Sequence, residues 1–241
     1  MTPSPLWYAT RGAGAVSLLL LTTVIVLGIA TMTRREGRSW PRLLSFRMHG
    51  NITWLALVFL SLHVVTALVD PFARLGWRDA VIPFASHYRP LWLGLGVVSA
   101  ELIAALVVTS ALRSRLKYRN WRAVHWIAYA CWPLAVLHSS GTGSDARAGW
   151  FVALDVFCIA AVFAALVGWR LAYGWPRAAG FRVTVALASG LSVVALALWM
   201  ANGPLAAGWA RAAGTPTDLL HSNAAVQSQG PTPGSARNLD G

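Results

Sequence analysis

Residues 49–69 read HGNITWLALVFLSLHVVTALV, an apolar run that begins with one histidine and carries another, His63, further along. About 20 apolar residues in a helix are enough to cross the hydrocarbon core of a bilayer. The chain holds five more runs of this kind, at 13–32, 91–112, 121–140, 150–172 and 181–201. The sequence therefore predicts an all-α protein built as a bundle of six transmembrane helices.

The composition of the whole chain agrees with a membrane protein. Of its 241 residues 56% are hydrophobic and only 12% are charged, and the mean hydropathy is +0.56. Soluble domains carry roughly a quarter charged residues, so these values exclude extensive disorder and argue against a water-soluble enzyme. The net charge of +12 does not indicate a nucleic-acid partner, because the basic residues form short clusters between the apolar runs.

The basic clusters predict how the chain lies in a plasma membrane. Thirteen of the 20 basic residues fall in three segments, 33–48, 113–122 and 170–182. Cytoplasmic loops carry the excess of Lys and Arg in membrane proteins. We therefore expect these segments in the cytoplasm, in contact with anionic lipid head groups, and both chain termini outside.

The chain divides into three parts by composition. A short N-terminal segment, 1–12, precedes the membrane domain at 13–201, and the tail at 202–241 is rich in Gly, Pro, Ser and Asn. The tail lacks apolar periodicity, so we expect it to be disordered. Neither a GxGxxG pattern nor a P-loop occurs, so nothing in the sequence indicates a nucleotide-binding domain.

Four of the six histidines occupy two of the predicted helices. His49 and His63 are 14 apart in the second helix, and His125 and His138 are 13 apart in the fourth. At 1.5 Å per residue, the two histidines of each helix are separated by about 20 Å along its axis. The second and fourth helices run parallel, so His49 and His125 share the cytoplasmic level and His63 and His138 the outer level. The spacing predicts two matched pairs of imidazoles, each able to hold a flat metal macrocycle between two helices.

The angular positions of the histidines differ between the two helices. At about 100° per residue, the spacing of His49 and His63 returns to within about 40° of the start, which places both on one helix face. The spacing of His125 and His138 leaves about 140° between them in a straight helix. Pro133 lies between them, and a proline inside a helix kinks it. We expect this kink to take up part of the mismatch.

Paired imidazoles at this spacing favour haem over zinc. A neutral imidazole is a common ligand of haem iron, whereas zinc takes three or four ligands clustered around one point. No CxxCH motif for covalent attachment is present. The residues therefore predict two six-coordinate b-type haems, one for each pair.

The pattern His-x13-His in one helix and His-x12-His two helices later resembles the ferric reductase-like transmembrane domain. That superfamily includes the membrane parts of ferric-chelate reductases and NADPH oxidases, and a bacterial haem-bearing subunit of a methionine-sulfoxide reductase. The resemblance covers about residues 10–200 and implies a six-helix, di-haem core that passes electrons across the membrane. It also implies that the haem ligands are His49, His63, His125 and His138.

Full-length reductases of this superfamily continue into cytoplasmic FAD- and NADPH-binding domains, which have no counterpart in this sequence. We therefore expect an electron-transfer subunit of an oxidoreductase rather than a complete reductase. A separate flavoprotein or membrane quinol would donate the electrons, and a separate redox partner outside the membrane would accept them.

Two arginines near the histidines are candidates for a supporting role. Arg47 and Arg122 precede His49 and His125 by two and three residues. Their guanidinium groups could hold the anionic propionates of a haem. The ordinary positive charge of cytoplasmic loops explains them equally well.

Other polar residues lie outside or between the histidine-bearing runs. His87, Tyr88 and Arg89 form a patch before the third helix that suits outer haem propionates, the electron acceptor or the membrane interface. Glu101 and Asp155 lie within the third and fifth helices, where an ionisable group is costly. They either pair with a polar neighbour or relay protons to a quinone site.

Two other functions fit the same runs. A quinol-oxidising di-haem cytochrome would require a quinone pocket and would use Glu101 or Asp155 to handle protons. A non-haem transporter or structural membrane protein would bind no chromophore. The runs show no paired broken helices and no inverted repeat, which argues against a transporter.

Overall fold

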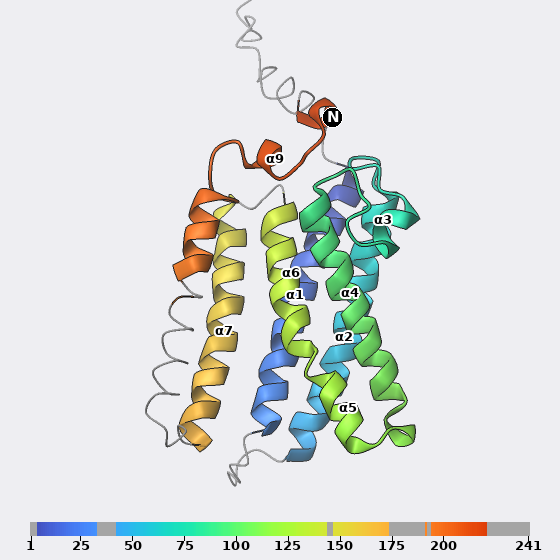
Figure 1. The fold of residues 1–241 in the computed structure, drawn as a ribbon, viewed down its shortest axis with the longest axis vertical. Coiled ribbons are helices and arrows are strands. Elements are labelled where there is room, and N and C mark those ends of the chain that lie inside the picture. The colour runs from blue at the N-terminus through green and yellow to red at the C-terminus, as the bar shows by residue number, and fades with distance from the viewer. Residues whose placement is uncertain (1–3, 33–41, 144–146, 174–190, 192–193, 221–241) are drawn as a thin grey trace, which may run out of the picture.

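The computed structural model describes residues 4–32, 42–143, 147–173, 191 and 194–220, which form helices and turns without a strand. Four long helices dominate the fold (Figure 1): α1 (Pro5–Met32), α2 (Arg42–Val69), α4 (Pro90–Ala111) and α7 (Gly149–Tyr173). Between α4 and α7 the chain forms the 3₁₀ turn η1 (Arg113–Arg115), α5 (Tyr118–His125) and α6 (Ala128–Thr142). Two small helices, α3 (Trp77–Val81) and α9 (Trp209–Ala212), and helical stretches at 194–202 and 217–220 complete the described part.

The long helices lie side by side, with α1, α4 and α7 running in one direction and α2, α5 and α6 in the other (Figure 1). Helix α1 packs along α2, α4 packs along α6, and α7 packs on α1. The end formed by residues 70–89 and 203–220 is called the upper end, as it stands in Figure 1, and the end formed by residues 112–118 the lower end.

Four helices are long and apolar enough to cross a membrane: Pro5–Thr31, Phe46–Val69, Pro90–Ala111 and Gly149–Gly168. They correspond to the first, second, third and fifth predicted runs. The all-α prediction is therefore confirmed for the part of the chain that the structure describes. The sixth predicted run, 181–201, falls largely outside the described residues, which are helical again at 194–202.

The fourth predicted run, 121–140, is two helices rather than one. Helix α5 ends at His125 and α6 begins at Ala128. Across the break three backbone N–H groups bond to the carbonyl three residues back, those of Ile127, Tyr129 and Ala130. Helix α6 continues through Pro133, so the interruption lies ahead of the proline and not at it. A proline disturbs the turn before it, because its ring meets the carbonyl of residue i−4, but the break here starts further back.

Helix α1 begins at Pro5, eight residues before the predicted run at 13–32. The Ser4 hydroxyl accepts a hydrogen bond of 3.0 Å from the Trp7 backbone N–H, which is the contact an N-cap serine makes. Proline suits the first helical position because its missing N–H has no partner there anyway. The first helix therefore takes in most of the segment 1–12.

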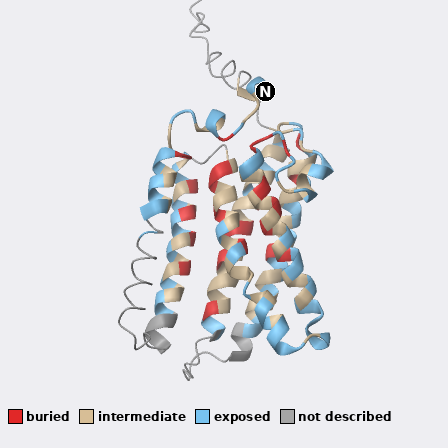
Figure 2. Cartoon of the chain, viewed as in Figure 1, coloured by how far each residue is buried: buried red, intermediate tan, exposed pale blue. Residues whose placement is uncertain are grey.

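Figure 2 shows the buried residues on the inward faces of the helices. A small core forms where Leu18 of α1, Val136 of α6 and Cys158 of α7 meet. The outward face of α2 is apolar and exposed, and its side chains include Trp54 and Val58. An apolar face left uncovered on a helix of spanning length is suited to lipid.

Residues 203–220, predicted to belong to a disordered tail, instead fold across the upper end. The Arg89 backbone N–H donates to the Gly214 carbonyl at 3.1 Å, and the Trp209 ring N–H donates to the Gly141 carbonyl of α6 at 3.2 Å. These bonds fasten the segment to the start of α4 and to the end of α6. Residues 221–241, including His221, lie outside the described residues.

Candidate functional site

Helix α2 places both of its histidines on one face. His49 and His63 are separated by about four helical turns. Ala56 lies between them on the same face and is 2% exposed, whereas Trp54 on the opposite face is 68% exposed. The histidine face of α2 therefore points into the bundle.

The structure brings the four histidines together in two pairs. The upper pair is His63 and His138, whose ring centroids are 6.2 Å apart with planes at 77°. The lower pair is His49 and His125, whose ring centroids are 6.4 Å apart with planes at 60°. Each pair joins α2 to the chain segment that contains α5 and α6.

The break between α5 and α6 is what allows His125 and His138 to face the same helix. A straight helix would leave about 140° between them. A 3₁₀ turn advances about 120° per residue instead of about 100°. The tight turns at the break therefore add rotation in the direction that closes the mismatch, a role that the sequence assigned to Pro133.

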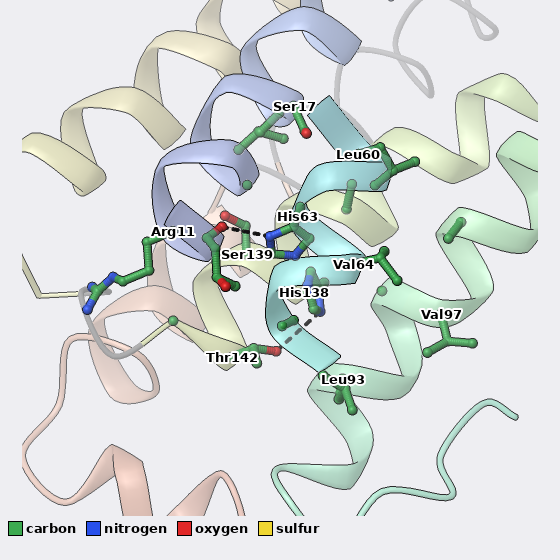
Figure 3. A pocket seen from close by; sticks show the side chains of 18 of the residues that line it. Arg11, Ser17, Leu60, His63, Val64, Leu93, Val97, His138, Ser139 and Thr142 are labelled. Carbon is green, nitrogen blue, oxygen red and sulfur yellow. Dashed lines mark hydrogen bonds between the residues drawn. The ribbon is translucent and has the colours of Figure 1, made fainter. Parts of the chain in front are cut away.

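The helices that carry the upper pair stand apart from each other. Among the described helices, α2 and α6 make few backbone contacts, because each packs on another partner. A cavity lies here, lined by His63 and His138 together with apolar side chains of α2 and α4 such as Leu60 and Val97 (Figure 3). The bundle thus leaves space between the two imidazoles of the upper pair.

The ring separations fit a metal ion held between two imidazoles. An imidazole–metal bond is about 2 Å long, and the ring centre lies roughly 1 Å behind the nitrogen, so two rings on opposite sides of one ion have centroids about 6 Å apart. Both observed separations, 6.2 and 6.4 Å, agree with this value. The described residues contain no group of three or more His, Cys, Asp or Glu side chains suited to a metal. Two facing imidazoles are a donor set that a haem iron accepts, whereas zinc takes three or four ligands clustered around one point.

Three of the four imidazoles bond to a backbone carbonyl through Nδ1. The pairs are His63 with Thr10 at 2.8 Å, His138 with Trp92 at 2.9 Å, and His49 with Val24 at 3.1 Å. A carbonyl oxygen can only accept, so the proton of each neutral ring lies on Nδ1 and the lone pair on Nε2 is free. Such a bond fixes the orientation of a metal-binding imidazole.

The fourth imidazole, His125, is held differently. Its Nδ1 is buried and has no hydrogen-bond partner within the described residues. Its ring stacks on Trp121, with centroids 4.8 Å apart and planes at 24°. The Arg113 guanidinium lies 4.5 Å from the centre of the Trp121 ring. Stacking therefore takes the place of a hydrogen bond at this histidine.

The predicted polar patch at 87–89 separates into two parts. His87 is exposed, while Tyr88 and Arg89 are buried. An Arg89 guanidinium nitrogen donates to the carbonyls of Gly141 and Thr142, both at 3.0 Å. These are among the last carbonyls of α6, which have no partner within the helix. A cation at this position also complements the negative end of the helix dipole.

Arg89 therefore secures the helix end that carries His138 rather than offering its charge to a ligand. The residue has a positive φ of 43°, a strained conformation that persists where neighbours hold it in place. Burial raises the pKa of the neighbouring Tyr88, and the guanidinium groups of Arg89 and Arg11 partly oppose this effect. The Tyr88 phenol is accordingly neutral at physiological pH.

The remaining predicted residues lie in different surroundings. Arg47 and Arg122 are exposed, and their contact with a propionate stays a prediction. Glu101 is exposed on α4. Asp155 of α7 is 2% exposed and accepts a hydrogen bond of 2.7 Å from the Ser140 hydroxyl of α6.

Sequence reasoning missed the carbonyl partners of the histidines, and it missed Arg11, which lines the cavity of the upper pair. Every residue has a carbonyl, so no residue type marks an acceptor. One signal was available for α1 and α2: Thr10 and Val24 have the same separation in the sequence as His49 and His63.

Residues 11–136, more than half of the chain, match the family described as the Ferric reductase like transmembrane component. The chain belongs to this family. Family membership and the four apolar helices together identify a multi-pass membrane protein. The matched part of this ferric reductase-like protein includes His49, His63 and His125, and it ends two residues before His138.

The ferric reductase-like chain is also similar to three curated proteins, each named protein-methionine-sulfoxide reductase heme-binding subunit MsrQ. They come from Bordetella pertussis, Bordetella parapertussis and Bordetella bronchiseptica. Each is 27% identical over 182 residues, which cover 73% of this chain and 80% of the relative. No solved structure matches the chain.

Proposed function

We propose that this chain is a membrane cytochrome that carries electrons across the membrane through two b-type haems. The observation that carries the proposal is the presence of two facing imidazole pairs with ring centroids 6.2 and 6.4 Å apart. Membership in the ferric reductase-like family and the similarity to heme-binding subunits support it. His63 and His138 would hold one haem, and His49 and His125 the other.

Haem bound at each pair supplies a one-electron iron couple. The chain's own residues supply the rest of the function. The hydrogen bonds from Nδ1 to carbonyls leave Nε2 of three rings unprotonated and able to bind a metal ion. Ala56 and Leu60 on the histidine face of α2 keep the region between the two levels apolar. Ligand geometry, hydrogen bonding and burial of this kind set the potential of a haem.

The proposed orientation places the lower end in the cytoplasm and the upper end outside. The lower end carries the basic segment 113–122, as the positive-inside rule requires. The membrane domain would be completed by a sixth span over 181–201, with Arg47 and Arg122 beside the propionates of the lower haem. A cysteine placed at the exposed His87 should react with a membrane-impermeant maleimide in whole cells, and one placed at Arg119 should not.

The proposed acceptor is a protein-methionine-sulfoxide reductase outside the membrane, because the relatives are named as subunits of such an enzyme. The chain would be the electron-transfer subunit, and reduction of the substrate would take place on the partner. The donor would be membrane quinol or a separate flavoprotein. Asp155 favours quinol, since a buried carboxyl bonded to Ser140 is able to hold a proton within the membrane. Rapid reduction of the purified protein by a quinol analogue, slowed in Asp155→Asn, would select quinol over the flavoprotein.

The test of the proposed function is a reduced-minus-oxidised optical spectrum of the detergent-purified protein with a pyridine haemochrome count. We expect two b-type haems per chain, and one in His63→Ala. His87→Ala serves as the control, because this exposed histidine belongs to neither pair. A colourless protein from cells with adequate haem would contradict the proposal and favour a transporter or structural role.

A further inference from the structure

A glycine lies four residues after each carbonyl that accepts a hydrogen bond from a histidine. In α1 the Thr10 carbonyl binds His63, and Gly14 follows one turn later. A Cβ atom added at Gly14 would lie 2.9 Å from Nδ1 of His63, which is closer than real Cβ contacts. The ring of His63 therefore occupies the space that a side chain at position 14 would fill.

The same arrangement recurs further along α1. The Val24 carbonyl binds His49, and Gly28 is the fourth residue after it. A Cβ atom at Gly28 would lie 3.6 Å from Cε1 of His49, an ordinary van der Waals contact. The separation of the two copies along α1 equals the histidine spacing on the antiparallel helix α2.

A third copy lies on α4, which packs on α6. The Trp92 carbonyl binds His138, and Gly96 is the fourth residue after it. A Cβ atom at Gly96 would overlap the His138 ring. Helices α1 and α4 are not adjacent in the chain, yet both present a carbonyl and a glycine at the same spacing to a histidine.

The geometry of a helix explains the spacing. Residues i and i+4 lie one above the other on a helix face, and each side chain leans back over the turn before it. A side chain at i+4 therefore covers the carbonyl of residue i on the outside of the helix. A carbonyl oxygen has a second lone pair beyond its helical bond, and a glycine at i+4 exposes it to a neighbouring imidazole.

We infer that Gly14 and Gly96 are positioning residues, which open a backbone carbonyl to a histidine and so turn its Nε2 toward the metal site. The inference rests on the proposed function for the identity of what Nε2 binds. It makes the upper pair dependent on two such glycines. In the lower pair a Cβ at Gly28 makes only an ordinary contact with His49, and His125 stacks on Trp121 instead.

The test is a series of glycine-to-alanine variants in the full chain with haem counted at each site. Gly12→Ala is the matched control, since it lies on α1 and a Cβ there meets nothing within 4 Å. We expect two haems in Gly12→Ala and in Gly28→Ala, and loss of the upper haem in Gly14→Ala and Gly96→Ala. Gly96→Ala should lower the haem content more than Gly14→Ala does. The Cβ added at position 96 overlaps the ring of His138, whereas the one added at position 14 only crowds the ring of His63.

A second measurement does not depend on any variant being stable. In reduced wild-type protein labelled with ¹⁵N in its histidine rings, the Nδ1 protons of His49, His63 and His138 should show the shift of a hydrogen-bonded imidazole. The Nδ1 proton of His125 should not. Equal signals from all four rings, or wild-type haem content in both Gly14→Ala and Gly96→Ala, would overturn the inference.

The two proposals fail in different ways. A wild-type protein without haem contradicts the proposed function whatever the glycine variants do. A wild-type protein with two haems whose count is unaffected by alanine at positions 14 and 96 leaves the cytochrome in place and removes the role of the glycines.

Discussion

The upper and lower histidine pairs have nearly the same ring separation, 6.2 and 6.4 Å, in very different surroundings. Both rings of the upper pair bond to carbonyls, and they line a cavity together with apolar side chains of α2 and α4. In the lower pair only His49 has such a bond, and α5, which carries His125, has no buried residue. Helix register therefore sets the distance between the rings, whereas contacts at Nδ1 or on the ring face set their orientation. The following changes separate these two effects, beginning with the largest.

Removing one histidine from each pair in turn should have the largest effect. His138→Ala and His49→Ala should each retain one haem of two, because the histidines of α2 stand about 20 Å apart along its axis. The two difference spectra should add up to that of the wild-type protein. Loss of both haems from a variant that elutes and melts like the wild type would show that the sites are not independent.

Arg89→Ala should disturb the upper pair and leave the lower pair in place. The substitution removes the guanidinium bonds to the carbonyls of Gly141 and Thr142 and to the Thr215 hydroxyl. A hydrogen bond to a charged group contributes about 1.5–3 kcal/mol, so we expect a loss of about 2–3 kcal/mol in unfolding free energy. Thermal unfolding in detergent, followed by haem absorbance, measures it.

Arg211→Ala is the control for that change, because Arg211 lies on α9 nearby and is exposed. Its free energy of unfolding should lie within about 0.5 kcal/mol of the wild-type value. If the Arg89 variant behaved in the same way, the bonds to the end of α6 would not stabilise the upper site.

Trp121→Leu should affect the lower pair alone. The stacked contact with His125 contributes about 0.5–1.5 kcal/mol. The lower haem should therefore dissociate up to about tenfold faster from the variant than from the wild type. Transfer of haem to an excess of a haem-scavenging protein gives the rate for each site. Trp121→Phe keeps an aromatic face, so its rate of haem loss should lie close to the wild-type rate. If Trp121→Leu accelerated haem loss equally at the upper site, a local stacking effect would be contradicted.

Thr142→Val should have the smallest effect. The Thr142 hydroxyl lies 3.3 Å from Nδ1 of His138, which already bonds to the Trp92 carbonyl at 2.9 Å. The longer of the two contacts is the weaker, so the change should be about 0.5 kcal/mol or less. A redox titration should detect at most a small shift in one of two components, and a loss of upper haem comparable to that of Gly96→Ala would assign the main contact to the hydroxyl.

Much of the helical arrangement could be predicted from the sequence. The apolar run at 49–69 is long enough to span a bilayer, and its histidine spacing specifies one face of a helix; both features are local. The run at 121–140 has the same appearance, but it breaks after His125. The break allows His125 and His138 both to face α2. This tertiary arrangement overrides the local preference for one continuous helix.

The upper end shows the same limit of local reasoning. Residues 203–220 have the composition of a disordered segment, yet Arg89 and Gly141 fasten them to two helices. Arg89 itself has the appearance of a ligand for an anion. Only the tertiary structure, in which Arg89 is buried against the end of α6, shows that its guanidinium group already donates to a backbone carbonyl.

The sequence by itself determined that the chain is an all-helical membrane protein with histidines placed at two depths, because hydropathy and helical period depend on residue type and spacing alone. The tertiary structure decided which atoms hold each imidazole. The acceptors at Thr10, Val24 and Trp92 are backbone carbonyls, which every residue possesses, so only the packing of α1 on α2 and of α4 on α6 selects them.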